Sequence, residues 1–243
     1  MISNNSFKKI KSLQQKKFRQ EHKKILVEGI RSVESIIDDG AIIDIALYTK
    51  EFKSKNVNFI SKINKGLLNE ITEKEMNQLS NSTAPPGILV VAKFPEYKRF
   101  DTNRNAILLD KISDPGNMGT IIRTAAWFGV DQIILTKGCI DPFNPKVVAS
   151  AMGSHFQLSF LGQEQLDLIN NFLWIGASAE GKPLDQLKNL NQRWVLVMGS
   201  EAHGIDSKIK SKLDKIYSIP RIGKGESLNV GVAMGIFLSK LAG

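Results

Sequence analysis

The sequence predicts an α/β protein in which a mostly parallel sheet with helices on both faces follows a small α/β domain. Three observations carry this prediction. Short apolar runs alternate with segments of helical periodicity along most of the chain. In the second half these runs are apolar throughout, which is typical of strands buried on both faces of a parallel sheet. Residues 96–105 are mainly polar, have no apolar periodicity and indicate a linker between the two parts.

Composition excludes several classes of protein. The chain has 243 residues, 42% of them hydrophobic, so it forms one or two globular domains and is neither disordered nor fibrous. No apolar run approaches the roughly eighteen residues of a membrane span, and the lysine-rich amino terminus lacks an apolar signal core. We therefore expect a cytoplasmic protein with no membrane partner. Cys139 is the only cysteine and the three histidines are scattered, so we expect neither a disulfide nor a metal site.

The amino-terminal segment, residues 1–24, is strongly basic. Eight basic side chains and one acidic side chain account for seven of the nine excess positive charges of the whole chain. Such a basic arm fits contact with phosphate backbones or anionic lipids, and it also fits a solvated helix face. Apolar residues recur among the lysines at roughly helical spacing. The segment can therefore be a helix that docks on its own domain or on RNA.

The first ninety-odd residues contain the elements of a small α/β domain. Three apolar runs predict strands: residues 25–28, 42–49 and 88–93. Helical spacing of Ile30, Val33, Ile36 and Ile37 predicts a helix that ends at 38–40. The sequence from Thr72 to Glu75 has the form of a capping box, which predicts a short helix ending near Leu79.

The second half alternates more regularly between strands and helices. Expected strands cover residues 106–110, 132–136, 156–160, 173–177, 194–198 and 216–219. Expected helices follow Asn117, begin near Pro145 and Glu164, cover 207–213, and follow Ser227. Because ligands of parallel sheets bind at loops that leave the carboxyl ends of strands, three of these loops are the places to look for a site.

The first loop follows strand 106–110 and leads through a Pro-Gly turn into an apolar helix. Asn117 is placed to cap that helix, and Gly116 and Gly119 allow close approach of a ligand or another backbone. Arg123 then stands as a single cation among apolar residues, so it needs a charged partner or a task. On this segment alone, the favoured interpretation is a capped helix with a buried ion pair.

The second loop, residues 199–204, follows strand 194–198. Two glycines bracket Glu201, so bare backbone can face a ligand while the carboxylate pairs with a cation. His203 invites a role in acid–base catalysis, but a histidine in a surface loop is most often incidental. We assign it no catalytic role.

The third loop, residues 219–229, enters a helix that is apolar on almost every side. Such a helix lies in a core or an interface. Ser227 fits the N-cap of this helix and fits a functional role equally well, and Asn229 is an unexpected polar residue at the mouth of a buried helix. The glycine patterns of standard dinucleotide-binding and P-loop enzymes do not occur in the chain, which argues against both classes.

Taken together, three segments resemble the motifs of the SpoU/TrmH branch of the SPOUT methyltransferases. They are Asn117-Met-Gly-x-x-x-Arg123, Met198-Gly-Ser-Glu-Ala-His-Gly204 and Ile219-Pro…Ser227-Leu-Asn-Val230. Order, spacing and placement after strands agree with that family over roughly residues 106–243. The amino-terminal part, through Leu26-Val-Glu-Gly-Ile-Arg31 and Leu79-Ser-Asn-Ser-Thr…Pro86-Gly87, resembles the small RNA-binding domain, similar in fold to some ribosomal proteins, that often precedes it.

These resemblances imply an organisation and an activity. They imply an RNA substrate-binding domain at residues 1–95, a linker at 96–105 and a methyltransferase domain at 106–243. The latter would be tied in a trefoil knot and work as a homodimer. The implied activity is methylation of a ribose 2′-hydroxyl of RNA with S-adenosylmethionine, with ribosomal RNA the expected substrate. Transfer RNA, or a non-catalytic assembly factor that binds RNA on the same fold, are the alternatives.

The resemblance also implies roles for individual residues. Catalytic roles fall on Arg123, Asn117, Glu201, Ser227 and Asn229, and the cofactor would lie against Gly199, Ile219, Leu228, Ala177 and Ser178. The family assigns help with the proton to the arginine. Because a guanidinium stays protonated in proteins, we expect Arg123 to orient the hydroxyl and stabilise the developing alkoxide, with Glu201 keeping it aligned and an RNA phosphate sharing in proton acceptance. His203 and Gly231 are at positions that we expect to tolerate variation.

Overall fold

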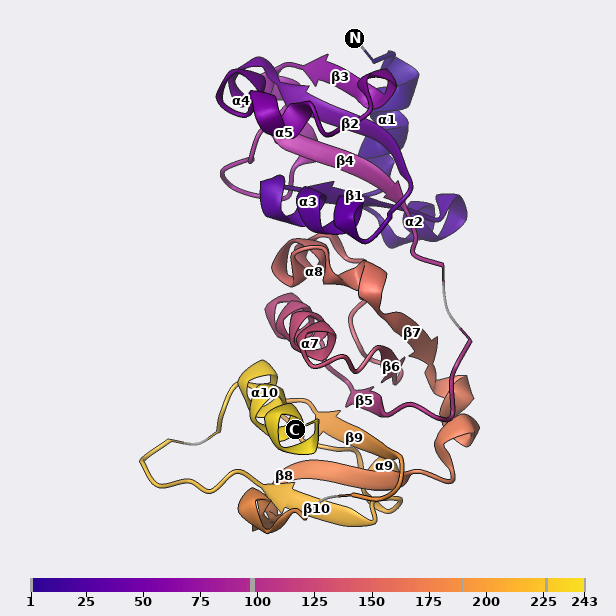
Figure 1. Ribbon diagram of the computed structural model, residues 1–243, viewed down its shortest axis with the longest axis vertical. Helices are drawn as coiled ribbons and strands as arrows, with labels where there is room; N and C mark the ends of the chain where they lie inside the picture. The colour runs from indigo at the N-terminus through magenta and orange to yellow at the C-terminus, as the bar shows by residue number, and fades with distance from the viewer. Residues whose placement is uncertain (1, 97–98, 189, 226, 243) are drawn as a thin grey trace. The chain divides into compact units, whose positions relative to one another are not determined.

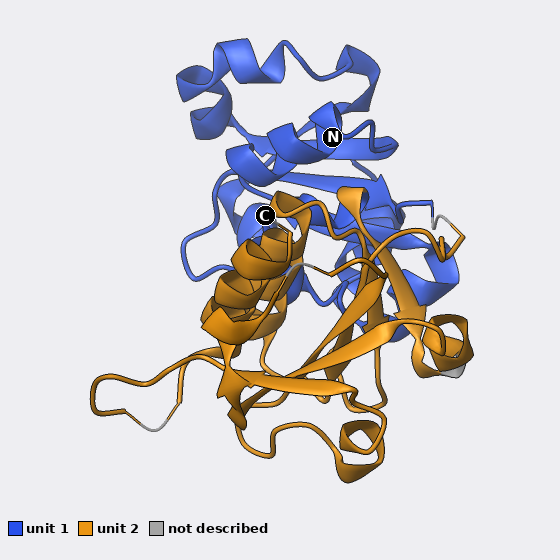
Figure 2. Ribbon diagram, turned by 60° about the horizontal axis from the view of Figure 1, so that its bottom comes forward, with its two compact units in different colours: residues 1–96, 141–156 blue, residues 97–140, 157–243 orange. Residues whose placement is uncertain are grey.

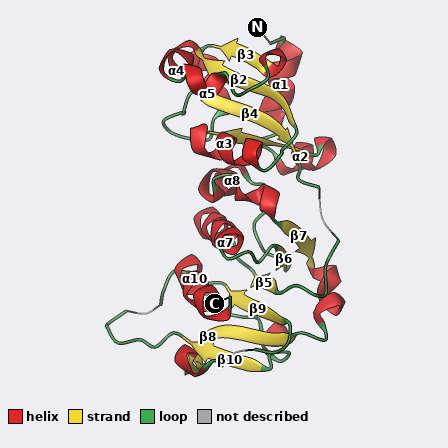
Figure 3. Cartoon of the chain, viewed as in Figure 1, coloured by secondary structure: helices red, strands yellow, loops and turns green. Residues whose placement is uncertain are grey.

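The computed structural model describes residues 2–96, 99–188, 190–225 and 227–242. The chain divides into two compact units (Figure 2). Unit 1 comprises residues 1–96 and 141–156, and unit 2 comprises residues 97–140 and 157–243. Helices and strands alternate in both units, so the predicted α/β class is confirmed (Figure 3).

Unit 1 is built on a four-stranded mixed sheet in the order β1-β4-β2-β3 (Figure 1). The strands are β1 (Lys24–Glu28), β2 (Ile43–Thr49), β3 (Leu68–Ile71) and β4 (Ile88–Lys93). β4 is antiparallel to both β1 and β2, whereas β2 and β3 are parallel. Sequence analysis predicts all of these strands except β3, which is short and only partly buried.

The helices of unit 1 cover this sheet. They are α1 (Asn4–Ser12), α2 (Lys16–His22), α3 (Ile30–Asp38), α4 (Lys50–Lys55), α5 (Val57–Ile60), α6 (Glu73–Leu79) and α8 (Pro145–Ala151), with 3-10 turns η1 (Lys65–Leu67) and η2 (Ser154–Gln157). The capping box at α6 is confirmed, because the Thr72 side chain accepts from the Glu75 N–H and the Glu75 carboxylate accepts from the Thr72 N–H. The sequence analysis does not identify α4 and α5.

The basic amino-terminal segment is folded onto unit 1. Ile10 and Leu13 are buried in a core cluster with residues of β1, β2, β4 and α6. Arg19 is the most buried large side chain of the segment, with 2% of its surface exposed. The expectation of a docked helix is therefore confirmed, because α1 and α2 of the basic segment are packed on unit 1 and do not form a free arm.

A segment from the second half of the sequence belongs to unit 1. Asp141 pairs with Arg19 at 2.5 Å, and the Phe143 ring stacks on Phe94 with centroids 4.3 Å apart. The backbone at Gly153 passes so close to α3 that a Cβ atom there would lie 2.8 Å from the Ser32 carbonyl oxygen. Compactness thus places residues 141–156 with the amino-terminal unit, whereas the sequence motifs extend continuously from 106 to 243.

Unit 2 contains a six-stranded sheet in the order β10-β8-β9-β5-β6-β7. Its strands are β5 (Ala106–Asp110), β6 (Gln132–Leu135), β7 (Ser159–Gly162), β8 (Leu173–Pro183), β9 (Trp194–Gly199) and β10 (Lys215–Ser218). Every pair of neighbouring strands is parallel. β5 and β9 are central and almost entirely buried, as their uninterrupted apolar sequences predict.

Both faces of this sheet are covered. One face packs on a cluster that includes Ile169 of η3 (Gln163–Ile169) and Ile209 of α9 (Ser207–Lys210). The helices α7 (Pro115–Trp127) and α10 (Val230–Leu241) pack together, and α10 contacts β9 (Figure 1). The predicted parallel sheet with helices on both faces is confirmed, and the trefoil knot stays a prediction. The segment expected to be helical from Glu164 is a 3-10 helix.

Candidate active site

Helix α7, which carries the first motif, begins three residues earlier than the sequence suggests. Asp114, rather than Asn117, is the N-cap, since its side chain accepts from the Asn117 N–H at 2.7 Å. Pro115 follows at the first helical position, where its missing N–H leaves no hydrogen bond unmade. The expectation that Asn117 caps this helix is wrong, and its side chain is free for other contacts.

Asn117 and Asn229 are brought together across 112 residues of sequence. The Asn229 side-chain amide donates to the Asn117 side-chain oxygen at 2.6 Å. Asn229 also caps α10, because its side-chain oxygen accepts from the N–H groups of Gly231 and Val232. Asn229, not Ser227, is therefore the N-cap, and it joins the first motif to the third.

Glu201 brings the second motif to the same place. Its carboxylate accepts from the Val230 N–H at 3.1 Å, at the first turn of α10. A carboxylate there also interacts favourably with the positive end of the helix dipole. The loop that carries Glu201 folds back on itself through a bridge between Ser200 and Gly204. Asn117, Glu201 and Asn229 thus converge on the amino terminus of α10.

Arg123 and Ser227 lie outside this convergence. Arg123 is exposed on α7, and within the described part of the chain no hydrogen bond or ion pair joins its side chain to another residue. The buried ion pair expected for Arg123 is therefore wrong, and so is its alignment by Glu201 within one chain. Ser227 is likewise exposed in the loop before α10.

Asp110, which is not among the predicted site residues, holds the backbone that follows the second loop. Asp110 is buried at the carboxyl end of β5, where its carboxylate accepts from the Thr136 hydroxyl at 2.8 Å and from the Asp206 N–H at 2.7 Å. Lys111 pairs with the Asp206 carboxylate at 2.7 Å, and this hydrogen bond raises the pKa of Lys111 and lowers that of Asp206. The sequence does mark Asp110 in one way, because it is an acidic residue at the end of an otherwise apolar strand.

The residues expected to hold S-adenosylmethionine fit that group. Gly199 ends β9 where the backbone is so close to the Gly204 carbonyl that a Cβ atom would lie 2.2 Å from its carbon, so only a bare backbone is accommodated. Ala177 and Ser178 follow the point where the β8–β10 ladder is interrupted, and both are partly exposed. Ile219 and Leu228 present accessible apolar surface after β10 and before α10. Partly exposed apolar side chains and open backbone suit an adenine ring.

α7 and α10 approach each other closely through two glycines of α10. A Cβ atom at Gly231 would lie 2.6 Å from the Thr120 methyl group, whereas one at Gly235 would lie 3.7 Å from the Thr124 methyl group. The expected tolerance at Gly231 is therefore wrong for any larger side chain.

The outer surface of this helix pair carries unexpected apolar area. Trp127 is 85% exposed, and Val232 and Ile236 are exposed on α10. Arg123 precedes Trp127 by one helical turn, so the two side chains share a face of α7. The nearly all-apolar helix expected to be buried thus has one face open in the single chain.

Two family models match the chain. The SpoU rRNA Methylase family matches residues 104–239, and an MRM3-like substrate binding domain matches residues 4–90. The chain belongs to the SpoU rRNA methylase family. The predicted family is confirmed, and with it the predicted class of enzyme, a methyltransferase that uses S-adenosylmethionine.

Relatives match from about two thirds to nearly all of the chain. The 23S rRNA (guanosine(2553)-2′-O)-methyltransferase RlmP of Bacillus subtilis is 30% identical over 99% of this chain and 97% of its own length. The mitochondrial rRNA methyltransferase 3 of Xenopus laevis is 32% identical over 66% of this chain and 40% of its own length. Among solved structures, an AdoMet-bound rRNA methyltransferase from Sinorhizobium meliloti is 26% identical, with a TM-score of 0.81 over 99% of this chain and 95% of that one.

Within the described residues, no helix is both long and apolar enough to cross a membrane. The same part of the chain contains no group of three or more His, Cys, Asp or Glu side chains that could hold a metal ion.

Proposed function

We propose that this member of the SpoU rRNA methylase family methylates a ribose 2′-hydroxyl of ribosomal RNA in the cytoplasm. The observation that carries the proposal is the convergence of Asn117, Glu201 and Asn229, from three separate motifs, on the amino terminus of α10. The ribosomal substrate is supported by the relatives that span the chain, since RlmP of Bacillus subtilis acts on 23S rRNA.

S-adenosylmethionine, when bound, supplies an electrophilic methyl group on a sulfonium centre. In this proposal Gly199, Ile219 and Leu228 hold the cofactor, and Ala177 and Ser178 lie near its adenosine. The backbone of these segments then supplies polar contacts, and the exposed apolar side chains exclude water from the adenine.

The paired amides of Asn117 and Asn229 form a rigid polar platform beside this site. Each amide retains a donor or an acceptor beyond their shared hydrogen bond, and these can orient the ribose hydroxyls. The Ser227 hydroxyl is available for the same task. Holding the hydroxyl in line with the methyl group is the main contribution a protein can make to such a displacement.

Arg123 stabilises the charge that develops on the ribose oxygen. A guanidinium cannot accept the proton, so Arg123 orients the hydroxyl and stabilises the alkoxide, while a phosphate of the RNA shares in accepting the proton. Arg123 shares an exposed face of α7 with Trp127, and Val232 and Ile236 are exposed on α10, which packs against α7. We therefore propose that a second copy of the chain covers this face and that the reaction site is completed in the homodimer.

Replacement of Arg123 tests this function. Arg123→Ala should retain S-adenosylmethionine binding in a calorimetric titration and lose methyl transfer to ribosomal RNA by roughly 100-fold or more. Arg193→Ala, which removes an exposed arginine just before β9, is the matched control and should leave both unchanged. Unchanged activity of Arg123→Ala would remove Arg123 from the mechanism. A parent chain that binds no S-adenosylmethionine would favour a non-catalytic RNA-binding factor.

Mapping 2′-O-methylated riboses in cells with and without the gene identifies the substrate. Loss of a methyl group from ribosomal RNA supports the proposal. Loss of a methyl group from transfer RNA alone would make transfer RNA the substrate, and the proposed reaction would stay the same.

A further inference from the structure

Six exposed lysines lie on the first two helices and at the residue that ends the second. This α1–α2 lysine surface consists of Lys8, Lys9, Lys11, Lys16, Lys17 and Lys23, all of them exposed. In the described part of the chain none of the six takes part in an ion pair. Glu21 is the one acidic side chain among residues 1–24. The surface therefore carries a net positive charge that nothing in its own segment neutralises.

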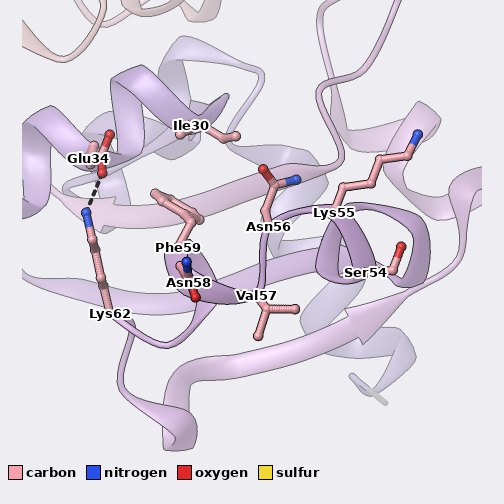
Figure 4. Close-up of a pocket in the computed structure, with 9 residues that line it drawn as sticks. All are labelled: Ile30, Glu34, Ser54, Lys55, Asn56, Val57, Asn58, Phe59 and Lys62. Atoms are coloured by element: carbon pink, nitrogen blue, oxygen red, sulfur yellow. Dashed lines mark hydrogen bonds and ion pairs between the residues drawn. The ribbon is translucent and has the colours of Figure 1, made fainter.

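Two lysines elsewhere in unit 1, Lys55 and Lys62, are paired with carboxylates. A depression of about 450 Å³ between α3 and the α4–α5 segment is lined by Lys55 and Lys62 (Figure 4). Lys62 pairs with Glu34 and Lys55 pairs with Glu51, each at 2.6 Å. An anion at this depression would have to displace a carboxylate. The α1–α2 lysine surface has no such competitor.

The helices that carry the surface are fixed in place. The Arg19 guanidinium donates to the carbonyl oxygens of Leu13 and Gln14, at 3.0 and 2.8 Å, and pairs with Asp141. These bonds close the turn between α1 and α2 around a buried side chain. Arg19 is thus withheld from any ligand and acts as a positioning residue. Lysines on fixed helices lose less backbone freedom on binding than lysines on a disordered arm.

We propose that the α1–α2 lysine surface binds the phosphate backbone of the RNA substrate. This inference rests on the proposed function, which makes RNA the partner. It assigns the contact to six side chains of α1 and α2 and gives them a sequence-independent task, which is to hold the RNA through phosphates. Specific recognition of the target is left to other residues.

The apolar side of α1 decides between RNA and a membrane. A helix that binds a bilayer inserts a free apolar face between the lipids. Here Ile10 and Leu13 are buried in the core of unit 1, and Phe7 packs against the same cluster. Only the lysine side of α1 remains accessible to a partner. That side fits RNA, a polyanion, better than a bilayer, into which a helix inserts apolar side chains.

The salt dependence of RNA binding tests the surface directly. In the full chain, Lys8, Lys11 and Lys16 are replaced together by Gln, which keeps helix propensity while removing charge. The matched control replaces Lys50, Lys65 and Lys74, which are equally exposed in unit 1 and lie on α4, η1 and α6. The probes are single-stranded oligouridine, a duplex RNA, and vesicles of phosphatidylcholine with phosphatidylserine.

The lysine-surface variant should bind RNA more weakly and with a flatter salt dependence. Each lost phosphate contact lowers the slope of log Kd against log salt by about 0.7 for single strands and 0.9 for duplexes, so three lysines lower it by about 2 to 3. The control variant should keep the parent slope. Equal slopes for the two variants would overturn the proposal. So would loss of vesicle binding with RNA binding unchanged, which would assign the surface to a membrane.

Methyl transfer to ribosomal RNA, measured alongside, separates this inference from the function on which it rests. At saturating RNA the lysine-surface variant should transfer methyl groups at the parent rate and show a raised KM. A parent chain that binds RNA with a steep salt slope but transfers no methyl group would refute the proposed function and leave the surface supported.

Discussion

Asn229 combines two tasks that usually fall to different residues. Its side-chain oxygen caps α10, and its side-chain nitrogen holds Asn117 of the first motif. Substitution to alanine therefore mixes a loss of stability with a loss of geometry at the proposed site. A residue that caps without reaching Asn117 separates the two.

Asn229→Ala and Asn229→Ser should differ in stability and agree in activity. Alanine removes the cap and should lower the free energy of unfolding by about 1 kcal/mol, whereas serine is an equally good N-cap and should keep it. Both variants lose the hydrogen bond to Asn117. The rate of methyl transfer should therefore fall roughly tenfold, which corresponds to the free energy of one hydrogen bond. Denaturant unfolding and single-turnover methyl transfer measure the two effects. Full activity of Asn229→Ser would mean that the amide pair is only structural.

Some residues of the site could be predicted from the sequence, and the surroundings of others could not. Asn117, Glu201 and Asn229 could be selected because each is a polar residue beside a strand end or a helix start. The surroundings of Arg123 could not, because Ile121, Ile122 and Ala125 are buried on other faces of α7 while Arg123 is exposed. The partner of Arg19 could not be predicted either, since Asp141 lies 122 residues away.

At the scale of elements, the α7–α10 pair positions the proposed site. Asn117 is in the first turn of α7 and Asn229 caps α10, so the distance between the helices sets the geometry of the amide pair. Gly231 and Gly235 face Thr120 and Thr124 across this contact, but only the first pair is tight.

Gly231→Ala and Gly235→Ala should have opposite effects on stability. Alanine at 231 should lower the free energy of unfolding by about 1–3 kcal/mol through overpacking, despite its better helix propensity. Alanine at 235 makes only an ordinary van der Waals contact. It should therefore leave the free energy of unfolding unchanged or raise it by up to about 1 kcal/mol. Thermal and denaturant unfolding compare the two. Thr120→Ser removes the nearer clashing atom and should restore part of the loss at 231; equal stabilities of the two glycine variants would contradict the close approach.

Elements that bury a regular face could be predicted from sequence, and the others could not. β5 and β9 are apolar at nearly every position because both of their faces are covered. β3 has a single buried residue and gives no periodic signal. α4 is a six-residue helix with lysines at three positions and one buried side chain, so tertiary packing rather than pattern defines it.

At the scale of the whole molecule, the exposed face of α7 and α10 is the feature that one chain leaves unexplained. Trp127 on α7 and Val232 and Ile236 on α10 expose apolar surface, and Arg123 lies one helical turn before Trp127. Exposed apolar patches of this kind mark interaction sites. The proposed homodimer gives this face a partner and gives Arg123 a less solvated environment.

Trp127→Glu should convert the dimer into a monomer. Because Trp127 is 85% exposed in the single chain, the substitution should leave the fold intact and place a charge in the interface. Sedimentation velocity measures the mass, and methyl transfer should fall together with dimer content. Ile42→Glu introduces the same charge at another exposed apolar residue, in unit 1, and should retain the parent mass. A dimeric Trp127→Glu would place the interface elsewhere.

The assignment of residues 141–156 to unit 1 bears on how such a protein can evolve. The substrate-binding domain model ends at residue 90, which suggests a module that genes could gain or lose by simple fusion. In the folded chain Arg19 of that module pairs with Asp141, and Phe94, which follows the module, stacks on Phe143. An exchange of the amino-terminal ninety residues between relatives would leave Arg19 or Asp141 buried without its counterion unless both segments changed together. The two parts of the gene are therefore expected to be inherited as one unit.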